Sequence, residues 1–323
     1  MEPPAADGSR GAAAPLVRTE PEIPAELRDW FSLLKPRVIT LVVFTGLIGL
    51  LLAPGHIHPV LAFTAVLCIA VAAGAAGAIN MWYDRDIDAI MRRTANRPIP
   101  GGRIGANDVL SFGVVLAVSS VLLMYLATNT VAAITLAASI LFYVFIYTMW
   151  LKRRTPQNIV IGGAAGAFPP VIGWAAVTGS IDVLPVLMFA IIFFWTPPHF
   201  WSLSLYASGD YERAGVPMLP VVSGAKTTRL HVLVYTAVLA VVSVLPWALG
   251  YAGGVYAVSA IGLSAWFLVA SVAVYRDKQD ATGVSLTGDA PARWAFRVSL
   301  VHLFALFGAL AADHYIWPYV PHL

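Results

Sequence analysis

Charge and cysteine are both scarce in this chain. Only 11% of its 323 residues are charged, and it has a single cysteine, Cys68. One cysteine excludes an intramolecular disulfide and a metal site built from several cysteines. The low charge content excludes an ordinary water-soluble domain, in which about a quarter of the residues are charged. Cys68 lies within an apolar run, where we expect it to be a small core residue.

Apolar residues take the place of the missing charge, at 59% of the chain, and they come in long runs. Only helices or a closed barrel can span a membrane. Runs of about 17–25 apolar residues without strict alternation indicate helices. The sequence therefore predicts an all-α integral membrane protein with about nine transmembrane helices. The expected spans are residues 38–54, 60–81, 108–127, 130–150, 158–178, 183–205, 230–249, 254–275 and 295–316.

Basic residues are absent from every second connection between these spans. All 20 lysines and arginines lie before the first span, in the loops 82–107, 151–157, 206–229 and 276–294, or, for Arg297, at the edge of the last span. The positive-inside rule makes these loops and the N-terminus cytoplasmic, and an odd number of spans then puts the C-terminus outside. The net charge of +3 therefore reports topology and gives no reason to expect nucleic-acid binding.

Residues 1–28 are predicted to form a tail before the first span. Residues 1–28 have neither the apolar core of a signal peptide nor the acid-poor, Arg/Ser-rich character of a transit peptide. Their Pro, Ala, Glu and Gly content predicts a disordered cytoplasmic tail. Residues 29–36 predict a short interfacial helix, which opens a single intramembrane domain over residues 29–323. The lack of a transit peptide favours a bacterial cytoplasmic membrane over a mitochondrion.

A row of polar residues closes the second expected span. Asn80, Asp84 and Asp88 are spaced four apart, so a helix puts them on one face. Carboxylates at the membrane edge are costly unless they are paired. A divalent cation is a natural partner, and Mg²⁺ is typically held by one or two carboxylates plus substrate phosphates. Asp86 lies about 200° around the helix from Asp84, so we expect it to be exposed or paired with an arginine.

Basic residues follow this row in two cytoplasmic loops. Arg93 and Arg97 come directly after the acidic residues, and Lys152 and Arg153 lie in the next basic loop. A solvated loop that obeys the positive-inside rule accounts for some of them, but it does not explain the aligned acids at membrane depth. Carboxylates, Mg²⁺ and arginines together predict a site for a diphosphate. The substrate-binding candidates beside the second basic loop are Tyr147 and Asn158.

The sixth expected span contains Pro197 and Pro198, followed by His199. Two prolines predict a broken helix that lines a cavity, since proline frees backbone carbonyls. His199 is a candidate to contact a flat ligand or carry a proton, although a lone buried histidine also occurs as a packing residue. Asp210, in the loop that follows, is a candidate third metal ligand beside Asp84 and Asp88. Arg229 is expected to be a topology signal.

These motifs resemble those of the UbiA superfamily of intramembrane prenyltransferases. The resemblance is carried by Asn80-x₃-Asp84-x₃-Asp88 followed by Arg93-Thr-Ala-Asn-Arg97-Pro, and it covers about residues 30–316. Three further stretches, at residues 162–170, 195–201 and 210–220, are similar to the branch of that superfamily that acts on haem. Members that act on small aromatics usually carry a second motif with several spaced aspartates, which here is reduced to Asp210 and Glu212.

The resemblance implies an activity. Farnesyl would pass from farnesyl diphosphate to a vinyl group of haem B with addition of water, with Mg²⁺ as cofactor and the site open to the cytoplasm. Possible protein partners are a haem A synthase or terminal oxidase assembly proteins. Two other functions stay open from the residues: prenylation of a phenol such as 4-hydroxybenzoate, and secondary transport. Transporters usually place such acids near the bilayer midplane, often in repeated halves, and neither feature is evident here.

Overall fold

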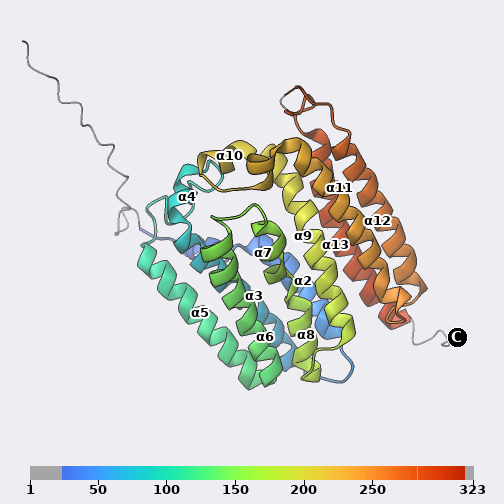
Figure 1. The fold of residues 1–323 in the computed structure, drawn as a ribbon. Coiled ribbons are helices and arrows are strands. Elements are labelled where there is room, and N and C mark those ends of the chain that lie inside the picture. The colour runs from blue at the N-terminus through green and yellow to red at the C-terminus, as the bar shows by residue number, and fades with distance from the viewer. Residues whose placement is uncertain (1–23, 282, 317–323) are drawn as a thin grey trace, which may run out of the picture.

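The structure is a computed structural model that describes residues 24–281 and 283–316. Figure 1 shows a bundle of long helices that run side by side, joined by loops and short helices at the ends. The described residues contain no strand, only an isolated bridge between Gln279 and Ser285. The prediction of an all-α membrane protein is confirmed.

The long helices follow the apolar runs. They are α2 (Pro36–Leu52), α3 (Pro59–Tyr83), α5 (Ala106–Ala127), α6 (Thr130–Leu141) with the π-helix η1 (Phe142–Leu151), α7 (Asn158–Ala167), α8 (Pro169–Thr178), α9 (Val183–Tyr206), α11 (Leu219–Ala248), α12 (Gly254–Tyr275) and α13 (Ala290–Ile316). Three short helices complete the described chain: α1 (Leu27–Leu33), α4 (Arg85–Ile90) and α10 (Ser208–Arg213). Helix α1 covers much of the expected interfacial helix, and most of the expected tail lies outside the described residues.

The number of spans agrees with the nine predicted. Eight helical segments of the described chain are long and apolar enough to cross a membrane, and α1 with α2 forms a ninth as a pair bent by 56°. The protein is therefore a multi-pass membrane protein. Helices α11 and α13 begin earlier than expected because each extends beyond its apolar run into a basic loop. Helix α11 does so across a break at Gly224, whose φ of 80° suits glycine.

The prolines act differently from the prediction. Helix α9 continues as one helix through Pro197 and Pro198, so the expected break in this span was wrong. The preceding span is the one that divides, at Phe168, because Pro169 begins a new helix as its first residue. Buried neighbours surround the α9 prolines, and packed helices often tolerate proline inside a span.

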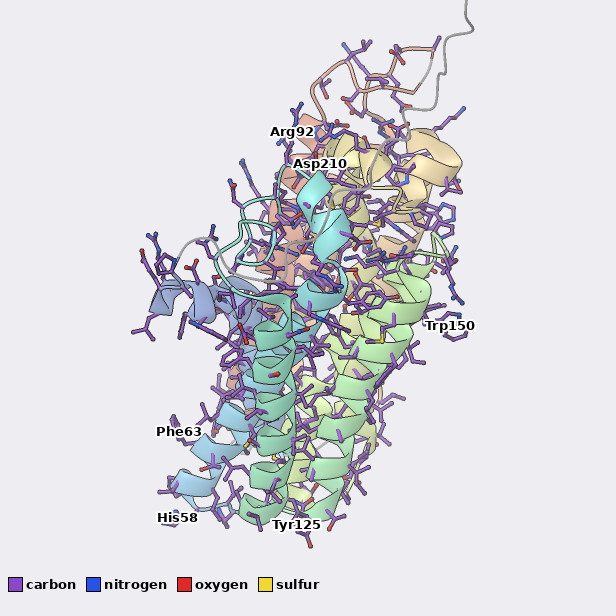
Figure 2. All side chains as sticks on the ribbon, turned by 90° about the vertical axis from the view of Figure 1, so that its left-hand side faces the viewer. His58, Phe63, Arg92, Tyr125, Trp150 and Asp210 are labelled. Atoms are coloured by element: carbon purple, nitrogen blue, oxygen red, sulfur yellow. The ribbon has the colours of Figure 1, made fainter. Side chains whose placement is uncertain are left out.

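The basic loops gather at one end of the bundle. Figure 1 places α4, α10 and the connection between α12 and α13 at the same end. Figure 2 shows Arg92 and Asp210 at that end, with His58 and Tyr125 at the other. This grouping agrees with the positive-inside pattern. The assignment of that end to the cytoplasm stays a prediction.

Two apolar cores meet at helices α2 and α8. The larger core is built by α9, α11, α12 and α13, and the smaller by α3, α6 and η1. Helix α2 adds Ile48 to the first core and Leu50 to the second, and α8 adds Trp174 and Ile172 in the same way. The α2–α8 pair therefore joins the two halves of the bundle.

Candidate functional site

Asn80 and Asp84 form the buried centre of the site. Asp84 ends α3 and begins α4, but the helical register continues through it: Asp84 N donates to Asn80 O at 2.9 Å, and Asp88 N to Asp84 O at 2.8 Å. Asn80 Nδ2 donates to Asp84 Oδ2 at 2.6 Å. Asp84 is 0% and Asp88 2% exposed. The prediction put Asn80, Asp84 and Asp88 on one face: the side chains of Asn80 and Asp84 meet as expected, and Asp88 follows one helical turn after Asp84.

The predicted basic residues meet these carboxylates. Lys152 Nζ donates to Asp84 Oδ2, and Arg153 Nη2 lies 3.5 Å from Asp84 Oδ1. Arg97 Nη1 lies 2.5 Å from Asp88 Oδ2. Residues far apart in the sequence are thus brought into one charged cluster. Ion pairs this deeply buried are costly to break, because either partner alone leaves an uncompensated charge.

The π-helix η1 and the residue after it place Thr148 and Lys152 beside Asn80 and Asp84. Its wider turn is shown by Lys152 N, which donates to Tyr147 O at 2.9 Å, five residues back. Thr148 Oγ1 accepts from Asn80 Nδ2 at 3.2 Å, one turn before Lys152 reaches Asp84. A Cβ on Gly162 would lie 2.2 Å from Tyr147 Cδ2, so this glycine leaves the space that Tyr147 fills. Short π-segments often occur at functional sites.

Asp86 and Arg153 form an outer pair at the rim. Arg153 donates two hydrogen bonds to the Asp86 carboxylate, at 2.6 and 2.7 Å, and its guanidinium lies 4.9 Å from the centre of the Tyr83 ring. The Asp86 side chain is 52% exposed, as the sequence predicted. Partial burial is the largest single influence and acts to raise the pKa of Asp86, but hydrogen bonding from Arg153, backbone hydrogen bonds and the charge of Arg153 together outweigh it, so the pKa is lowered. Asp86 therefore positions Arg153 from outside the buried centre.

Lys35 completes the cluster, and the sequence analysis missed it. Its Nζ donates to Asn80 Oδ1 at 2.9 Å, and it interacts electrostatically with Asp84 and Asp88. Its side chain passes Gly77, where a Cβ would lie 3.4 Å from Lys35 Cδ. The available signal was a lysine directly before the proline that begins a span. Lys35 was instead counted within the short interfacial helix.

The donor set fits a magnesium–diphosphate. No group of three or more His, Cys, Asp or Glu side chains suited to a metal occurs among residues 24–281 and 283–316. Mg²⁺ needs only one or two carboxylates when phosphate and water supply the rest, and Asp84 and Asp88 meet that need. Four cations face three carboxylates here, which leaves positive charge for an anion. Arg153 Nε is buried without a hydrogen-bond partner in the described chain, so a donor is also unused.

Two further predicted residues lie around Tyr147. Its hydroxyl interacts electrostatically with Asp84, with Arg93 and with Tyr211 of α10. Asn158 is fully buried, donates from Nδ2 to Thr155 O at 2.6 Å, and has no partner for Oδ1 among the described residues. Arg93, Tyr147 and Asn158 thus lie at the junction of the three basic loops.

Asp210 sits on α10 above this junction. Its carboxylate is paired with Arg213 one turn further on. The neighbouring Tyr211 packs with Ile87 and Met91, which holds α10 against the segment after Asp84. The second motif therefore lies beside the first. The role of Asp210 as a third metal ligand stays a prediction.

His199 forms a separate aromatic centre. Its ring is stacked between Trp195, at 4.3 Å, and Phe296 of α13, at 4.5 Å. Its Nδ1 lies 2.7 Å from Ser299 Oγ, which also lies 2.7 Å from Phe296 O. Which atom donates between His199 and Ser299 depends on the tautomer of the ring. His199 is therefore held between two aromatic rings and by one polar contact with α13.

The sequence matches the UbiA prenyltransferase family over residues 42–300. A protoheme IX farnesyltransferase from Granulibacter bethesdensis is 67% identical over 309 residues, which cover 96% of this chain and 97% of that protein. A protoheme IX farnesyltransferase from Acidiphilium cryptum is 68% identical over 288 residues, covering 89% and 91%.

Solved structures share the fold. A digeranylgeranylglyceryl phosphate synthase superposes with a TM-score of 0.72 at 18% identity, covering 89% of this chain and 98% of that one. A UbiA homolog from Archaeoglobus fulgidus bound to GPP and Mg²⁺ gives a TM-score of 0.62 at 14% identity, covering 87% and 99%. The architecture is thus shared with proteins of distant sequence.

Proposed function

Because this chain belongs to the UbiA prenyltransferase family, we propose that it transfers the farnesyl group of farnesyl diphosphate to a vinyl group of haem B, with addition of water, to give haem O. The observation that carries the proposal is the buried pair Asp84 and Asp88 enclosed by cations from three segments of the chain. Such a cluster suits a diphosphate leaving group. The names of the two bacterial relatives indicate that the acceptor substrate is haem B.

The buried cluster provides the diphosphate site. Asp84 and Asp88, with Asn80 assisting, are the residues that would hold Mg²⁺. When bound, the ion adds positive charge that stabilises the diphosphate as the C–O bond breaks. Lys152 and Arg153 are placed to neutralise the same developing charge. Because protein groups already hold these side chains in position, little reorganisation is needed as the bond breaks.

Carbon chemistry follows in the apolar interior. The diphosphate leaves with the bonding electron pair, and the vinyl π-bond of the acceptor attacks C1 of the allylic cation. Water then adds to the cation formed beside the porphyrin and loses a proton, so that the acceptor gains one farnesyl group and one hydroxyl group and diphosphate is released. The surrounding helices keep water from the allylic cation before the vinyl group reaches it.

The proposed setting follows from charge placement. We place the basic end of the bundle, with the diphosphate site, at the cytoplasmic face of a bacterial membrane. Both the soluble diphosphate substrate and magnesium are available from that side. A haem A synthase or a terminal oxidase assembly protein is the proposed recipient of the product.

The decisive experiment is mass spectrometry of haem after incubation of the purified protein with haem B, farnesyl diphosphate and Mg²⁺. We expect a haem heavier by one farnesyl group and one hydroxyl group, and no such product when EDTA is present. Unchanged haem from folded protein would rule out this acceptor. The same assay with 4-hydroxybenzoate would then test the phenol alternative.

Replacing His199 with alanine is expected to raise the KM for haem B about tenfold and to leave the KM for farnesyl diphosphate unchanged. The reason is that the ring of His199 contacts Trp195, Phe296 and Ser299, none of which belongs to the charged cluster. Steady-state kinetics with each substrate varied would measure the split. His58→Ala, at the opposite end of the bundle, is the control. Equal rises in both KM values would contradict a role in acceptor binding.

A further inference from the structure

The first turns of α13 carry two arginines beside the aromatic centre. Arg293 and Arg297 are four residues apart and therefore share a face of the helix. The Arg293 guanidinium lies 4.4 Å from the centre of the Tyr206 ring, at the end of α9. Both guanidinium groups interact electrostatically with the Tyr206 hydroxyl. Three donors from two helices thus converge.

Most N–H groups of these two arginines have no hydrogen-bond acceptor among the described residues. No carboxylate of the described chain forms an ion pair with Arg293 or Arg297. The nearby Asp289 lies 3.4 Å from Arg229 and interacts with Arg293 electrostatically, beyond ion-pair distance. Arg293 donates only from Nε, to Gly288 O at 3.4 Å. The positive-inside rule explains why arginines occur at this end, but not why both lie at one tyrosine.

A stack of aromatic rings adjoins the donors. The Tyr206 ring meets the edge of Phe296 at 6.4 Å, and Phe296 is stacked on His199. His199 and Tyr206 are seven residues apart, which puts them on one side of α9, about 10 Å along its axis. The aromatic stack around His199 therefore lies at one end of this side of α9, and the arginine and tyrosine donors lie at the other.

We propose that Arg293, Arg297 and Tyr206 bind the carboxylate groups of a flat tetrapyrrole acceptor. This inference rests on the proposed function, in which the acceptor is haem B and the carboxylates are its two propionates. Arginine holds carboxylates through paired, charge-assisted hydrogen bonds. The propionates of haem B lie on the edge of the ring opposite its vinyl groups. Binding that edge at α13 leaves the vinyl-bearing edge free for prenylation and fixes which way the ring enters.

The test compares haem B with its dimethyl ester, in which both carboxylates are blocked. Affinity is measured by optical titration of the purified full-length protein, and turnover by mass spectrometry. We expect Arg297→Gln and Arg293→Gln each to weaken haem B binding about tenfold, the size of one charge-assisted hydrogen bond. The affinity for the dimethyl ester and the KM for farnesyl diphosphate should not change. Arg297→Lys should lose less, since it keeps the charge but not the fork.

Arg276→Gln is the matched control. Arg276 follows the last residue of α12, at the same end of the bundle, and is exposed. Its replacement by glutamine removes the same positive charge as Arg297→Gln. Equal effects of Arg297→Gln on haem B and on the ester, or no effect on either, would overturn the inference. A wild-type protein that binds haem B in this carboxylate-dependent way but never farnesylates it would refute the proposed function instead.

Discussion

Replacing Asp84 with asparagine is expected to lower kcat/KM for farnesyl diphosphate by about a thousandfold. Asp84 is fully buried and pairs with Lys152 and Arg153. Removing one partner of a buried ion pair costs about 3–5 kcal/mol, which corresponds to roughly two to four orders of magnitude in rate if the loss is felt in the transition state. The variant also loses one of the two carboxylates that suit Mg²⁺. The measurement is steady-state kinetics at saturating haem B.

Asp86→Asn is the matched control for this variant. It removes one carboxylate charge from the same short segment, but Asp86 is half exposed, and the amide oxygen of asparagine can still accept a hydrogen bond from Arg153 and hold it in position. Exposed pairs contribute little, so we expect kcat/KM to stay within about threefold of wild type. Size-exclusion profiles of both variants should match the wild type. Comparable losses in the two variants would show that general charge, and not the buried position of Asp84, matters.

The helices and the first half of the site were predictable because their signals are local. Apolar runs define the spans, and a spacing of four places Asn80 and Asp84 together whatever the rest of the chain does. The sequence cannot show a change of helix type. Residues 142–151 are apolar and aromatic, like any span, yet they adopt a π-helix that directs Thr148 and Lys152 at α3.

Helix ends and breaks were harder to predict, since packing decides them. Pro169 divides a span whereas Pro197 and Pro198 do not, although all three are prolines within apolar runs. Arg229 shows the same limit for charge. It was expected to be a topology signal, but it is 2% exposed, lies 3.6 Å from Asp277 and anchors the loop before α13.

The missed site residues share one property: each lies far in sequence from the motif it serves. Lys35 reaches Asn80 across 45 residues. Ser299 reaches His199 across 100 residues. Single lysines and arginines in the basic loops are what the positive-inside rule already expects, and a serine within an apolar helix is common, so the sequence offers no reason to select these. Only the folded arrangement shows that they lie beside the functional candidates.

Replacing Gly173 with alanine is expected to lower the apparent melting temperature by about 10 °C and to reduce the yield of folded protein. A Cβ on Gly173 would lie 2.0 Å from Gly46 O, and one on Gly49 would lie 2.1 Å from Pro170 O. Both obstacles are backbone atoms, which cannot rotate away, so α2 and α8 must separate. Overpacking of this kind costs roughly 1–3 kcal/mol or more, and each kcal/mol lowers the melting temperature by a few degrees.

Gly262→Ala separates this steric effect from the helix propensity of glycine. Gly262 lies in the exposed face of α12 with nothing within 4 Å of an added Cβ. Alanine there should leave the melting temperature unchanged or raise it slightly, since glycine inside a helix costs up to about 1 kcal/mol relative to alanine. Because α2 and α8 each serve both apolar cores, their separation should also displace Lys35 at the start of α2 and lower turnover. A Gly173→Ala protein as stable as Gly262→Ala would show that α2 and α8 do not approach this closely.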